Sequence, residues 1–454
     1  MSQFVFNYQR VFFHSLILLL MLLIASTLVA QEQKSNNQRY TSQGVKVEEA
    51  KIEETKPQEE NKLVIKPTLA FQLWGSYTTQ QQVYNETTQQ FDAVDDRLNF
   101  QLHRSRMGWK GSYGSRWVYD MTGSLDFVGQ DALAGTVGGL NSGGSPRFRI
   151  WNALIQYKAS ASSEGLYITM GYQAPQLSRE SITSPFVVGS FEKAWSQNYI
   201  RRHTTGTPPG RAVGVNIGGL TNTQDTKFAV NYDVGIYNPR VLTSGATTGG
   251  LNSRPLLTYR LGIHLGDPET AKYSRGKKFN TRGNRQGVTL SLSGSYQGES
   301  DTWDDNSSFG VDLLANYGLF NISGEWMQLK RSLGSAESTA TTGFIKLGYS
   351  TKTQNGKEIE PVIAYVFLDG ALDRQAQEDT RMVGAFAGKD NYLEFTLNYY
   401  VTPKIRWSVS YTLRNGDEGD FDPTLVNNNF FQQGGVGPVN KGDYLGVGLL
   451  LFSI

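Results

Sequence analysis

The sequence predicts an all-β fold, namely a transmembrane antiparallel β-barrel of about 16 strands with long external loops and the third loop folded into the pore. Three observations predict it. Apolar and polar residues alternate with period two, in segments of about ten residues, which is the length of a tilted membrane-spanning strand. The connections between these segments alternate between long and short. Aromatic residues reach 12% on a polar background that contains 49 glycines.

The composition excludes several other classes of protein. The chain has 454 residues, no cysteine and a formal net charge of +2. Without cysteine it can hold no disulfide framework, thiolate metal site, cysteine nucleophile or lipidated N-terminal cysteine. The near-neutral charge gives no general positive field for nucleic acid. A hydrophobic content of 39% and a mean hydropathy of −0.39 exclude a membrane protein built from many helices.

The N-terminal part of the chain reads as export and linker segments. Residues 1–30 carry one cation, Arg10, and then a long apolar run that turns small and polar before Ala30. This pattern predicts a signal peptide cleaved after Ala30, with an uncleaved anchor helix as the alternative. Residues 31–62 are rich in Lys and Glu and almost free of aromatic residues, which predicts a charged periplasmic linker. The barrel domain then covers residues 63–454.

The alternation is clearest in four segments, 257–265, 288–296, 393–399 and 405–413. In the last of these the apolar residues are Ile405, Trp407, Val409, Tyr411 and Leu413, and polar residues lie between them. The apolar faces carry aromatic rings near their ends, as in the aromatic girdles of membrane barrels. A soluble β-sandwich shows the same alternation, so the lengths of the connections must decide between the two.

The predicted strands lie near 66–77, 98–110, 116–128, 147–158, 165–173, 211–220, 226–238, 255–266, 287–298, 308–317, 319–330, 341–351, 359–369, 390–400, 403–414 and 442–453. Long connections follow odd-numbered strands, at 78–97, 129–146, 174–210, 239–254, 370–389 and 415–441, whereas most others are tight turns. This asymmetry is typical of an outer-membrane barrel with both termini in the periplasm. The connection 267–286 is an exception, because it is long where a short turn is expected. It is also basic, and we interpret it as a solvated periplasmic loop.

Charged residues of both signs fall on the polar face of the predicted strands. A barrel of about 16 strands is too wide for side chains to fill, so an aqueous channel follows. The predicted lumen cations are Arg104, Arg106, Lys110, Lys158, Lys227, Arg260, Lys346, Arg406 and Arg414. The predicted lumen anions are Asp120, Asp126, Asp233, Asp312, Glu325 and Glu394. The excess of cations predicts a mild preference for anions, with Arg104, Arg106, Lys110, Arg260, Arg406 and Arg414 as pore-lining, anion-binding candidates.

An ordered set of motifs resembles the phosphate-selective porin O and P family. The motifs are His103-Arg104-Ser105-Arg106-Met107-Gly108-Trp109-Lys110-Gly111, Gly171-Tyr172-Gln173-Ala174-Pro175, Leu177-Ser178-Arg179-Glu180-Ser181, Arg211-Ala212-Val213-Gly214-Val215, Gly324-Glu325-Trp326 and Leu397-Asn398-Tyr399-Tyr400. They span roughly residues 65 to 454 in the family's order. The resemblance implies a homotrimer of sixteen-stranded diffusion channels that take up anions or phosphate.

The third long connection, 174–210, is long enough to fold into the barrel and constrict it. In sixteen-stranded porins the third loop does this. The candidate constriction residues are Arg179, Glu180, Ser181, Glu192, Lys193, Arg201, Arg202 and Arg211. Guanidinium groups bind phosphate-like oxyanions through two parallel hydrogen bonds, and serine hydroxyls add neutral donors. An ordinary surface loop is the alternative.

These observations predict an outer-membrane porin of a diderm bacterium for passive diffusion of small hydrophilic solutes, anionic or neutral. Its expected partners are outer-membrane lipid, the solutes and two further copies of the chain, with no nucleic acid. No catalytic residue, cofactor or metal is expected. The acidic loops around Asp301 to Asp305 and Asp417 to Asp422 complete no calcium-loop pattern.

Two other functions remain open at this stage. One is a barrel that acts as an adhesin or structural anchor, for which the third loop would lie outside the pore. The other is a secreted all-β hydrolase that uses a carboxylate pair such as Glu325 and Glu394. Within the channel class, a general porin and an anion-selective one are both open.

Overall fold

The computed structural model describes residues 62–135, 146–207, 209–222, 227–239, 252–277 and 285–453. The predicted signal peptide and all but the last residue of the predicted linker lie outside these residues, so both stay predictions.

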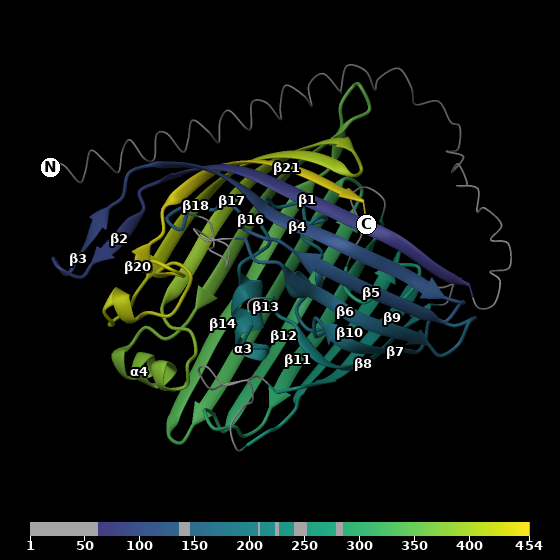
Figure 1. The fold of residues 1–454 in the computed structure, drawn as a ribbon, viewed down its shortest axis with the longest axis horizontal. Coiled ribbons are helices and arrows are strands. Elements are labelled where there is room, and N and C mark those ends of the chain that lie inside the picture. Colours follow the sequence, from purple (N-terminus) through teal and green to yellow (C-terminus); the bar gives the residue numbers. More distant parts are fainter. Residues whose placement is uncertain are drawn as a thin grey trace. The chain divides into compact units, whose positions relative to one another are not determined.

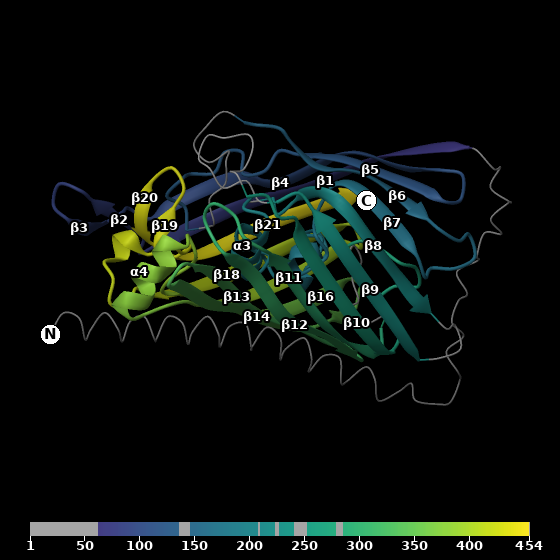
Figure 2. The ribbon, with the colours of Figure 1, turned by 90° about the horizontal axis from the view of Figure 1, so that it is seen from below.

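Sixteen strands form one closed antiparallel barrel. Figures 1 and 2 show these strands running side by side around a common interior. Each strand pairs with its neighbours along the chain, and the first strand also pairs with the last, which closes the sheet. The strands are β1 (Leu63–Thr79), β4 (Arg97–Tyr113), β5 (Trp117–Ser124), β6 (Arg149–Lys158), β7 (Tyr167–Gln173), β8 (Ala212–Asn222), β9 (Phe228–Tyr237), β10 (Leu256–Gly266), β11 (Gly287–Gln297), β12 (Asp305–Tyr317), β13 (Phe320–Leu333), β14 (Ala336–Tyr349), β16 (Glu358–Asp369), β17 (Lys389–Thr402), β18 (Ile405–Asp417) and β21 (Asp443–Ser453). The predicted fold class is confirmed, and every predicted strand overlaps an observed one.

The two ends of the barrel differ in their connections. β1 begins and β21 ends at the end with mostly tight turns. The turn between β12 and β13, for example, needs only Gly318 and Leu319, and Gly318 adopts φ +57°, a conformation that favours glycine. At the other end the longer loops contain a small sheet and two helices. These elements are β2 (Gln82–Asn85), β3 (Gln90–Ala93), β19 (Gln432–Gln433), β20 (Gly437–Asn440), α4 (Arg374–Met382) and the 3-10 helix η1 (Pro423–Leu425).

Two local details complete the strand assignment. β13 and β14 extend well past the predicted ends and meet in a tight turn at Gly334, where a longer gap between strands was expected. After β15 (Thr351–Lys352), the backbone N–H of Thr353 donates to the Lys357 carbonyl at 2.7 Å and closes a turn.

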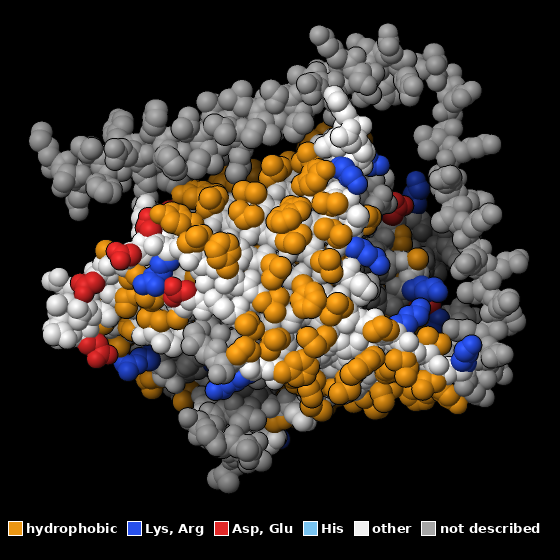
Figure 3. All heavy atoms as spheres, turned by 45° about the horizontal axis from the view of Figure 1, so that its top comes forward, with side chains coloured by type: hydrophobic (Ala, Val, Ile, Leu, Met, Phe, Trp, Pro, Cys, Tyr) orange, Lys and Arg blue, Asp and Glu red, His pale blue; other side chains and the backbone are white. Residues whose placement is uncertain are grey.

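The barrel has an apolar exterior and a polar interior. In β10, Tyr259, Leu261 and Ile263 are exposed, whereas Thr258, Arg260 and His264 at alternate positions are buried. The same alternation recurs in β11 and β18. Figure 3 shows the result, a barrel surface covered with hydrophobic side chains on which charged residues gather mainly toward the ends. Such a surface is suited to lipid, and closure leaves no unpaired strand edge within it.

Two β-bulges change the parity of the strands that line one wall. In β4 the pairing with β1 jumps from Arg104 to Leu102, so His103 is an extra residue and both His103 and Arg104 point inward. In β6 the pairing with β5 jumps from Asn152 to Ile150, so Trp151 is the extra residue. A bulge re-aims the side chains around it, and here it brings the Trp151 ring into the interior.

Loop 3, residues 174–211 between β7 and β8, lies inside the barrel. It contains α2 (Arg179–Ile182) and α3 (Ser196–Thr204), and α3 is seen within the barrel in both ribbon views (Figures 1 and 2). The prediction that the third loop folds into the pore is confirmed. The adhesin alternative places this loop outside the pore, so the observed position does not fit it. None of the helices in the described residues is long and apolar enough to cross a bilayer.

The connection between β10 and β11 departs from our interpretation of it as a solvated loop. The first of its two described parts, residues 267–277, turns back into the barrel from the end with the tight turns. Glu269 and Tyr273 on it are buried, and its backbone pairs with loop 3 between Thr183 and Lys277. We call residues 267–277 the turn-side segment.

Candidate functional site

Loop 3 is attached first by its short helix α2. The Ser178 hydroxyl caps this helix by accepting from the Ser181 N–H at 3.2 Å, and it donates to the Glu325 carboxylate at 2.9 Å. Glu325 also accepts from the Glu180 N–H at 3.3 Å. A carboxylate on β13 thereby satisfies backbone and cap groups at a helix N-terminus, where N–H groups lack partners within the helix.

The second attachment is apolar. On the inner faces of β13, β14 and β16 a patch replaces the polar parity expected of a channel wall, and loop 3 covers it. The patch and the loop residues that pack on it are Leu177, Tyr199, Ile200, Met327, Leu329, Ala340, Leu368 and Phe386, with Ala194, Trp195, Phe344, Val366 and Tyr392 beside them. The Tyr199 hydroxyl within this patch donates to Asp390 at 2.5 Å. The hydrophobic effect therefore holds α3 against this wall, as it holds a protein core.

The third attachment is a buried charge cluster around Asp312. The Arg179 guanidinium donates to Asp312 at 2.7 Å and to Glu269 of the turn-side segment at 2.6 Å. Arg260 donates to the same Asp312, and to the Leu177 carbonyl at 2.9 Å. Burial alone would lower the pKa of Arg179, but Glu269 and Asp312 outweigh it, so the net shift is upward. Arg179 and Arg260 are thus committed to carboxylates.

The fourth attachment joins loop 3 to β4. Glu192 accepts from His103 at 2.6 Å and from Arg104, both of which the bulge directs inward. Burial raises the pKa of the Glu192 carboxyl, but Arg104 and His103 lower it by more, to about 2. Glu192 is therefore ionised at neutral pH and compensates the charge of Arg104.

Three more of the predicted wall cations also hold the loop. Lys346 pairs with Glu180 at 2.6 Å. Arg414 pairs with Asp390 at 3.1 Å and stacks on Trp195, 3.8 Å from the ring centroid. Arg406 donates to the loop carbonyl of Val188.

Beside the fixed loop lies a cavity of about 750 Å³, which we call the cation-lined cavity. It is bounded by loop 3, by the tip of the turn-side segment and by the wall of β1, β4, β5 and β6. Six cationic side chains and one carboxylate line it, namely Arg106, Lys110, Lys193, Arg201, Arg211, Arg275 and Asp120. Ser181, Thr68, Thr122 and Asn152 add neutral polar groups.

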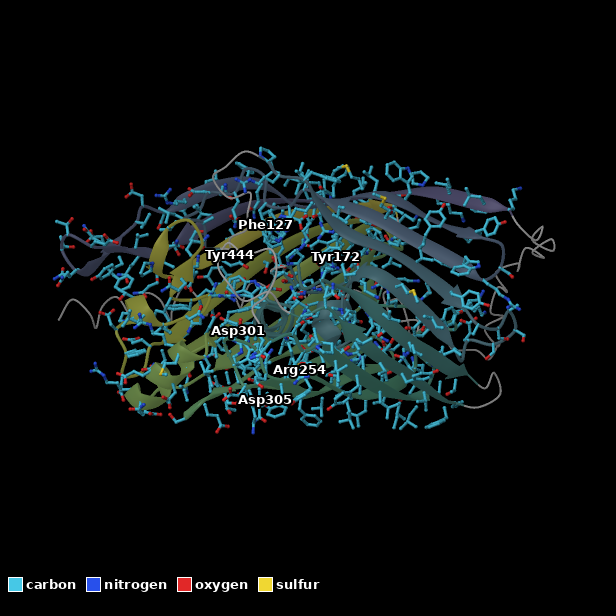
Figure 4. All side chains as sticks on the ribbon, turned by 60° about the horizontal axis from the view of Figure 1, so that its bottom comes forward. Phe127, Tyr172, Arg254, Asp301, Asp305 and Tyr444 are labelled. Carbon is cyan, nitrogen blue, oxygen red and sulfur yellow. The ribbon has the colours of Figure 1, made fainter. Side chains whose placement is uncertain are left out.

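Two of these arginines are held by an aromatic ring. The guanidinium carbons of Arg106 and Arg211 each lie 3.8 Å from the Trp151 ring centroid. Stacking on an aromatic face fixes a guanidinium while leaving its N–H edge free to bind. Arg106 is also paired with Asp126. Tyr172, which is half-buried and labelled in Figure 4, is the last residue but one of β7, close to where loop 3 begins.

Most of the charge in this cavity has no carboxylate partner among the described residues. Within that part of the chain, Lys110, Lys193, Arg201, Arg211 and Arg275 form no ion pair closer than 4.0 Å. Lys193 and Arg201 donate only to loop carbonyls, at 2.6 Å and 2.7 Å. Nη2 of Arg106, Nε of Arg201, Nε of Arg211 and the Ser181 hydroxyl are buried without a hydrogen-bond partner in the described structure.

The pKa values of the cavity cations reflect this excess of positive charge. Burial and the charge of Arg201 together lower the pKa of Lys193 well below the usual lysine range. Burial and the neighbouring Arg201, Arg106 and Arg275 likewise lower the pKa of Arg211. Since each cation raises the free energy of the others, an anion in the cavity would relieve the repulsion.

A second cavity of about 600 Å³ lies on another side of loop 3, and its charges are balanced. Its three cations and three carboxylates are Arg179, Lys277, Lys346, Glu180, Glu269 and Glu360. Arg179 and Lys277 both pair with Glu269, at 2.6 Å and 2.7 Å, and Lys346 pairs with Glu180. The interior therefore contains one compensated and one uncompensated set of charges.

The structure divides the predicted site residues between these roles. Arg106, Lys110, Ser181, Lys193, Arg201 and Arg211 line the cation-lined cavity. Arg104, Arg260, Arg406, Arg414, Arg179, Glu180 and Glu192 attach loop 3. Arg202 lies against the Phe386 ring and donates to Asn427 at 3.2 Å. The anion-binding function that the sequence predicts for the strand and loop 3 residues stays a prediction.

Sequence reasoning missed Trp151 and Arg275. Strict parity puts Trp151 on the lipid face, because a single-residue bulge leaves no clear mark in one sequence. For Arg275 a signal was present, namely a basic run on a connection that should have been short.

The carboxylate pair considered for a hydrolase is used elsewhere. Glu325 binds the start of loop 3, as described above. Glu394 accepts from the backbone N–H groups of Phe191 and Glu192, at 2.7 Å and 3.2 Å. Both carboxylates are therefore engaged with loop 3.

Comparison with solved structures identifies the fold. The outer-membrane channel DcaP of Acinetobacter baumannii shares 13% sequence identity, covering 86% of this chain and 97% of its own, with a TM-score of 0.52. An anion-selective porin from Comamonas acidovorans shares 12% identity, covering 86% of this chain and 100% of its own, with a TM-score of 0.51. OprB of Pseudomonas putida shares 10% identity, covering 86% and 94%, with a TM-score of 0.51. No protein-family model matches the chain, and no curated protein matches it.

The chain therefore has the barrel fold of outer-membrane porins. A closed antiparallel barrel with an apolar exterior is the architecture by which strands cross an outer membrane, and this protein belongs in the outer membrane of a diderm bacterium.

Proposed function

We propose that this protein is an outer-membrane porin through which small hydrophilic solutes diffuse passively, and that it prefers anions to cations. The observation that carries the proposal is the cation-lined cavity, in which five cations lack a carboxylate partner among the described residues. A water-filled passage lined by one sign of charge concentrates ions of the opposite sign.

The geometry favours oxyanions within that class. Guanidinium N–H edges in fixed positions match the paired oxygens of phosphate, sulfate or carboxylate better than a single halide. The ordered motifs that resemble the phosphate-selective porin O and P family support phosphate as one candidate, and we propose membership of that family and a homotrimer on the same grounds. The role is that of a channel, so neither a catalytic group nor a cofactor takes part in it.

The test is the reversal potential of the refolded protein in a planar bilayer under a KCl gradient. We expect an anion-biased potential in the wild type and a loss of bias in the double variant Arg201→Gln, Arg211→Gln. Each removed charge should lower the anion-to-cation permeability ratio about tenfold, because a Coulomb energy of about 0.7 kcal/mol at about 6 Å in water acts with opposite sign on the two ions.

Arg116→Gln is the matched control, because Arg116 is an exposed arginine in the turn between β4 and β5. It should leave the ratio unchanged. Added phosphate should partly block the chloride current of the wild type and block the double variant less. A wild-type channel with no bias, or a bias that the double variant keeps in full, would contradict the proposal.

A further inference from the structure

The turn-side segment is attached inside the barrel at its first buried residue, Glu269. Its carboxylate accepts from Arg179 of loop 3 at 2.6 Å and forms an ion pair with Lys277 of the segment itself at 2.7 Å. Burial raises the pKa of Glu269, but these two cations lower it by more, so the net shift is well downward and the group is ionised at neutral pH. One carboxylate thus joins the segment to the constriction loop.

A second attachment lies at Tyr273. Its hydroxyl donates to Asp233 of β9 at 2.6 Å, and its ring stacks on Tyr167 of β7 at 4.7 Å between centroids. Its backbone N–H donates to the carboxylate of Glu164 at 3.0 Å. These contacts fix the middle of the segment to the barrel wall.

The third attachment is between backbones. The Lys277 N–H donates to the Ile182 carbonyl at 3.0 Å, and the Ser184 N–H donates to the Lys277 carbonyl at 2.7 Å. The Gly276 N–H donates to the Gln176 side chain at 2.9 Å. Gly276 adopts φ +77°, which favours glycine and lets the chain turn back beside loop 3.

Arg275 lies between the second and third attachments and therefore has a fixed backbone. Its side chain lines the cation-lined cavity. It forms no ion pair with the described residues, and its nearest polar partner is the Gln173 amide oxygen at 3.4 Å. Its charge reaches the other cavity cations, since it contributes to the lowered pKa of Arg211.

We propose that the turn-side segment is a second constriction element, which enters the barrel from the end opposite to loop 3. We further propose that Arg275 contacts the oxyanion that occupies the cation-lined cavity. The segment enters from the end with tight turns, so Arg275 completes the site from the periplasmic side. This inference rests on the proposed anion-channel function and adds to it a specificity-determining residue outside loop 3 and the barrel strands.

The first test compares two charge removals on the same segment. Arg275→Gln should lower the anion-to-cation permeability ratio about tenfold, as for any unit charge at similar range in water. Lys272→Gln is the matched control, because Lys272 is an exposed cation on the same segment, and it should leave the ratio unchanged. Heat-modifiable migration on gels shows that each variant is a folded barrel.

The second test uses the absence of native cysteine and acts on channels that are already folded. In Arg275→Cys, an anionic methanethiosulfonate should lower the ratio further, and a cationic one should restore it toward the wild-type value. Lys272→Cys should react with both reagents without a change in the ratio.

The outcomes separate this inference from the proposed function. A wild-type channel without anion preference would remove the proposed function and this inference with it. A wild-type preference that Arg275→Gln leaves intact, or an Arg275→Cys variant whose thiol does not react or reacts without effect, would overturn the role of Arg275 alone.

Discussion

At the scale of single residues, the interior cations differ in what neutralises them. Arg104, Arg179 and Arg260 are each within hydrogen-bond reach of a carboxylate, whereas Arg201 and Arg211 reach only carbonyl oxygens. Removing one partner of a buried pair leaves the other charge uncompensated and destabilises the fold. Removing an uncompensated cation relieves repulsion. Substitutions in the two groups should therefore have different consequences, namely misassembly in the first and altered selectivity in the second.

Lys193 gives a pH-dependent prediction. Its pKa is lowered well below the usual lysine range by burial and by neighbouring arginines, while guanidinium groups keep their charge throughout this range. As the pH rises through the lowered pKa, Lys193 loses its charge at a lower pH than an exposed lysine does, so the anion-to-cation permeability ratio should fall about tenfold there. Reversal potentials measured from pH 5 to pH 10 check this.

Lys193→Arg is the matched variant, because it keeps a cation that does not titrate. Its anion preference should stay level over the same pH range. An equal decline in wild type and Lys193→Arg would contradict the assignment.

At the scale of elements, loop 3 is a folded unit whose surface matches the barrel wall. An apolar patch on β13, β14 and β16 packs against the apolar face of α3. The carboxylates Glu325 and Glu394 accept hydrogen bonds from backbone N–H groups of the loop. The constriction is therefore a property of wall and loop together.

The docking of loop 3 onto β4 should depend on the charge of Glu192. The pKa of this carboxyl is about 2 in the fold, below its value in an unfolded chain, so its contribution is fully present above about pH 4 and is lost as the pH falls toward 2. Wild-type channels should conduct quietly from pH 7 to about pH 4 and become noisy at lower pH. Glu192→Gln should be noisy throughout, because Arg104 and His103 lose their anionic partner.

Single-channel current noise is the measurement. Glu86→Gln is the control, because Glu86 is an exposed acid outside the barrel strands, and it should behave as wild type does. A Glu192→Gln channel that is as quiet as wild type at neutral pH would show that this contact does not hold the loop.

The sequence pattern predicts some features of these elements and misses others. The period-two alternation predicts the approximate position of every barrel strand, because one face of each strand contacts lipid and the other contacts polar groups. Parity fails at His103 and Trp151, where a bulge inserts one residue. It also cannot tell which lumen cation meets a carboxylate, since Arg260 and Asp312 approach each other only through the register of β10, β11 and β12. The path of the turn-side segment depends on Tyr273 and Gly276 meeting distant partners, and no local pattern encodes that.

At the scale of the whole barrel, loop 3 and the turn-side segment occupy the interior and leave cavities of unequal charge. The cavity against β1, β4, β5 and β6 holds uncompensated cations, and the other holds ion pairs. Anions should therefore bind in the first cavity and not in the second. The position of a bound anion inside the barrel tests this difference between the two cavities.

The most direct measurement is anomalous diffraction from crystals of the protein soaked in selenate, an oxyanion with a strong scatterer. We expect a selenium peak in the cation-lined cavity, within hydrogen-bonding reach of Arg201 and Arg211, that is lost in the double variant Arg201→Gln, Arg211→Gln. A peak in the balanced cavity instead, or selenate bound only on the surface of a crystal whose interior is open to solvent, would contradict it.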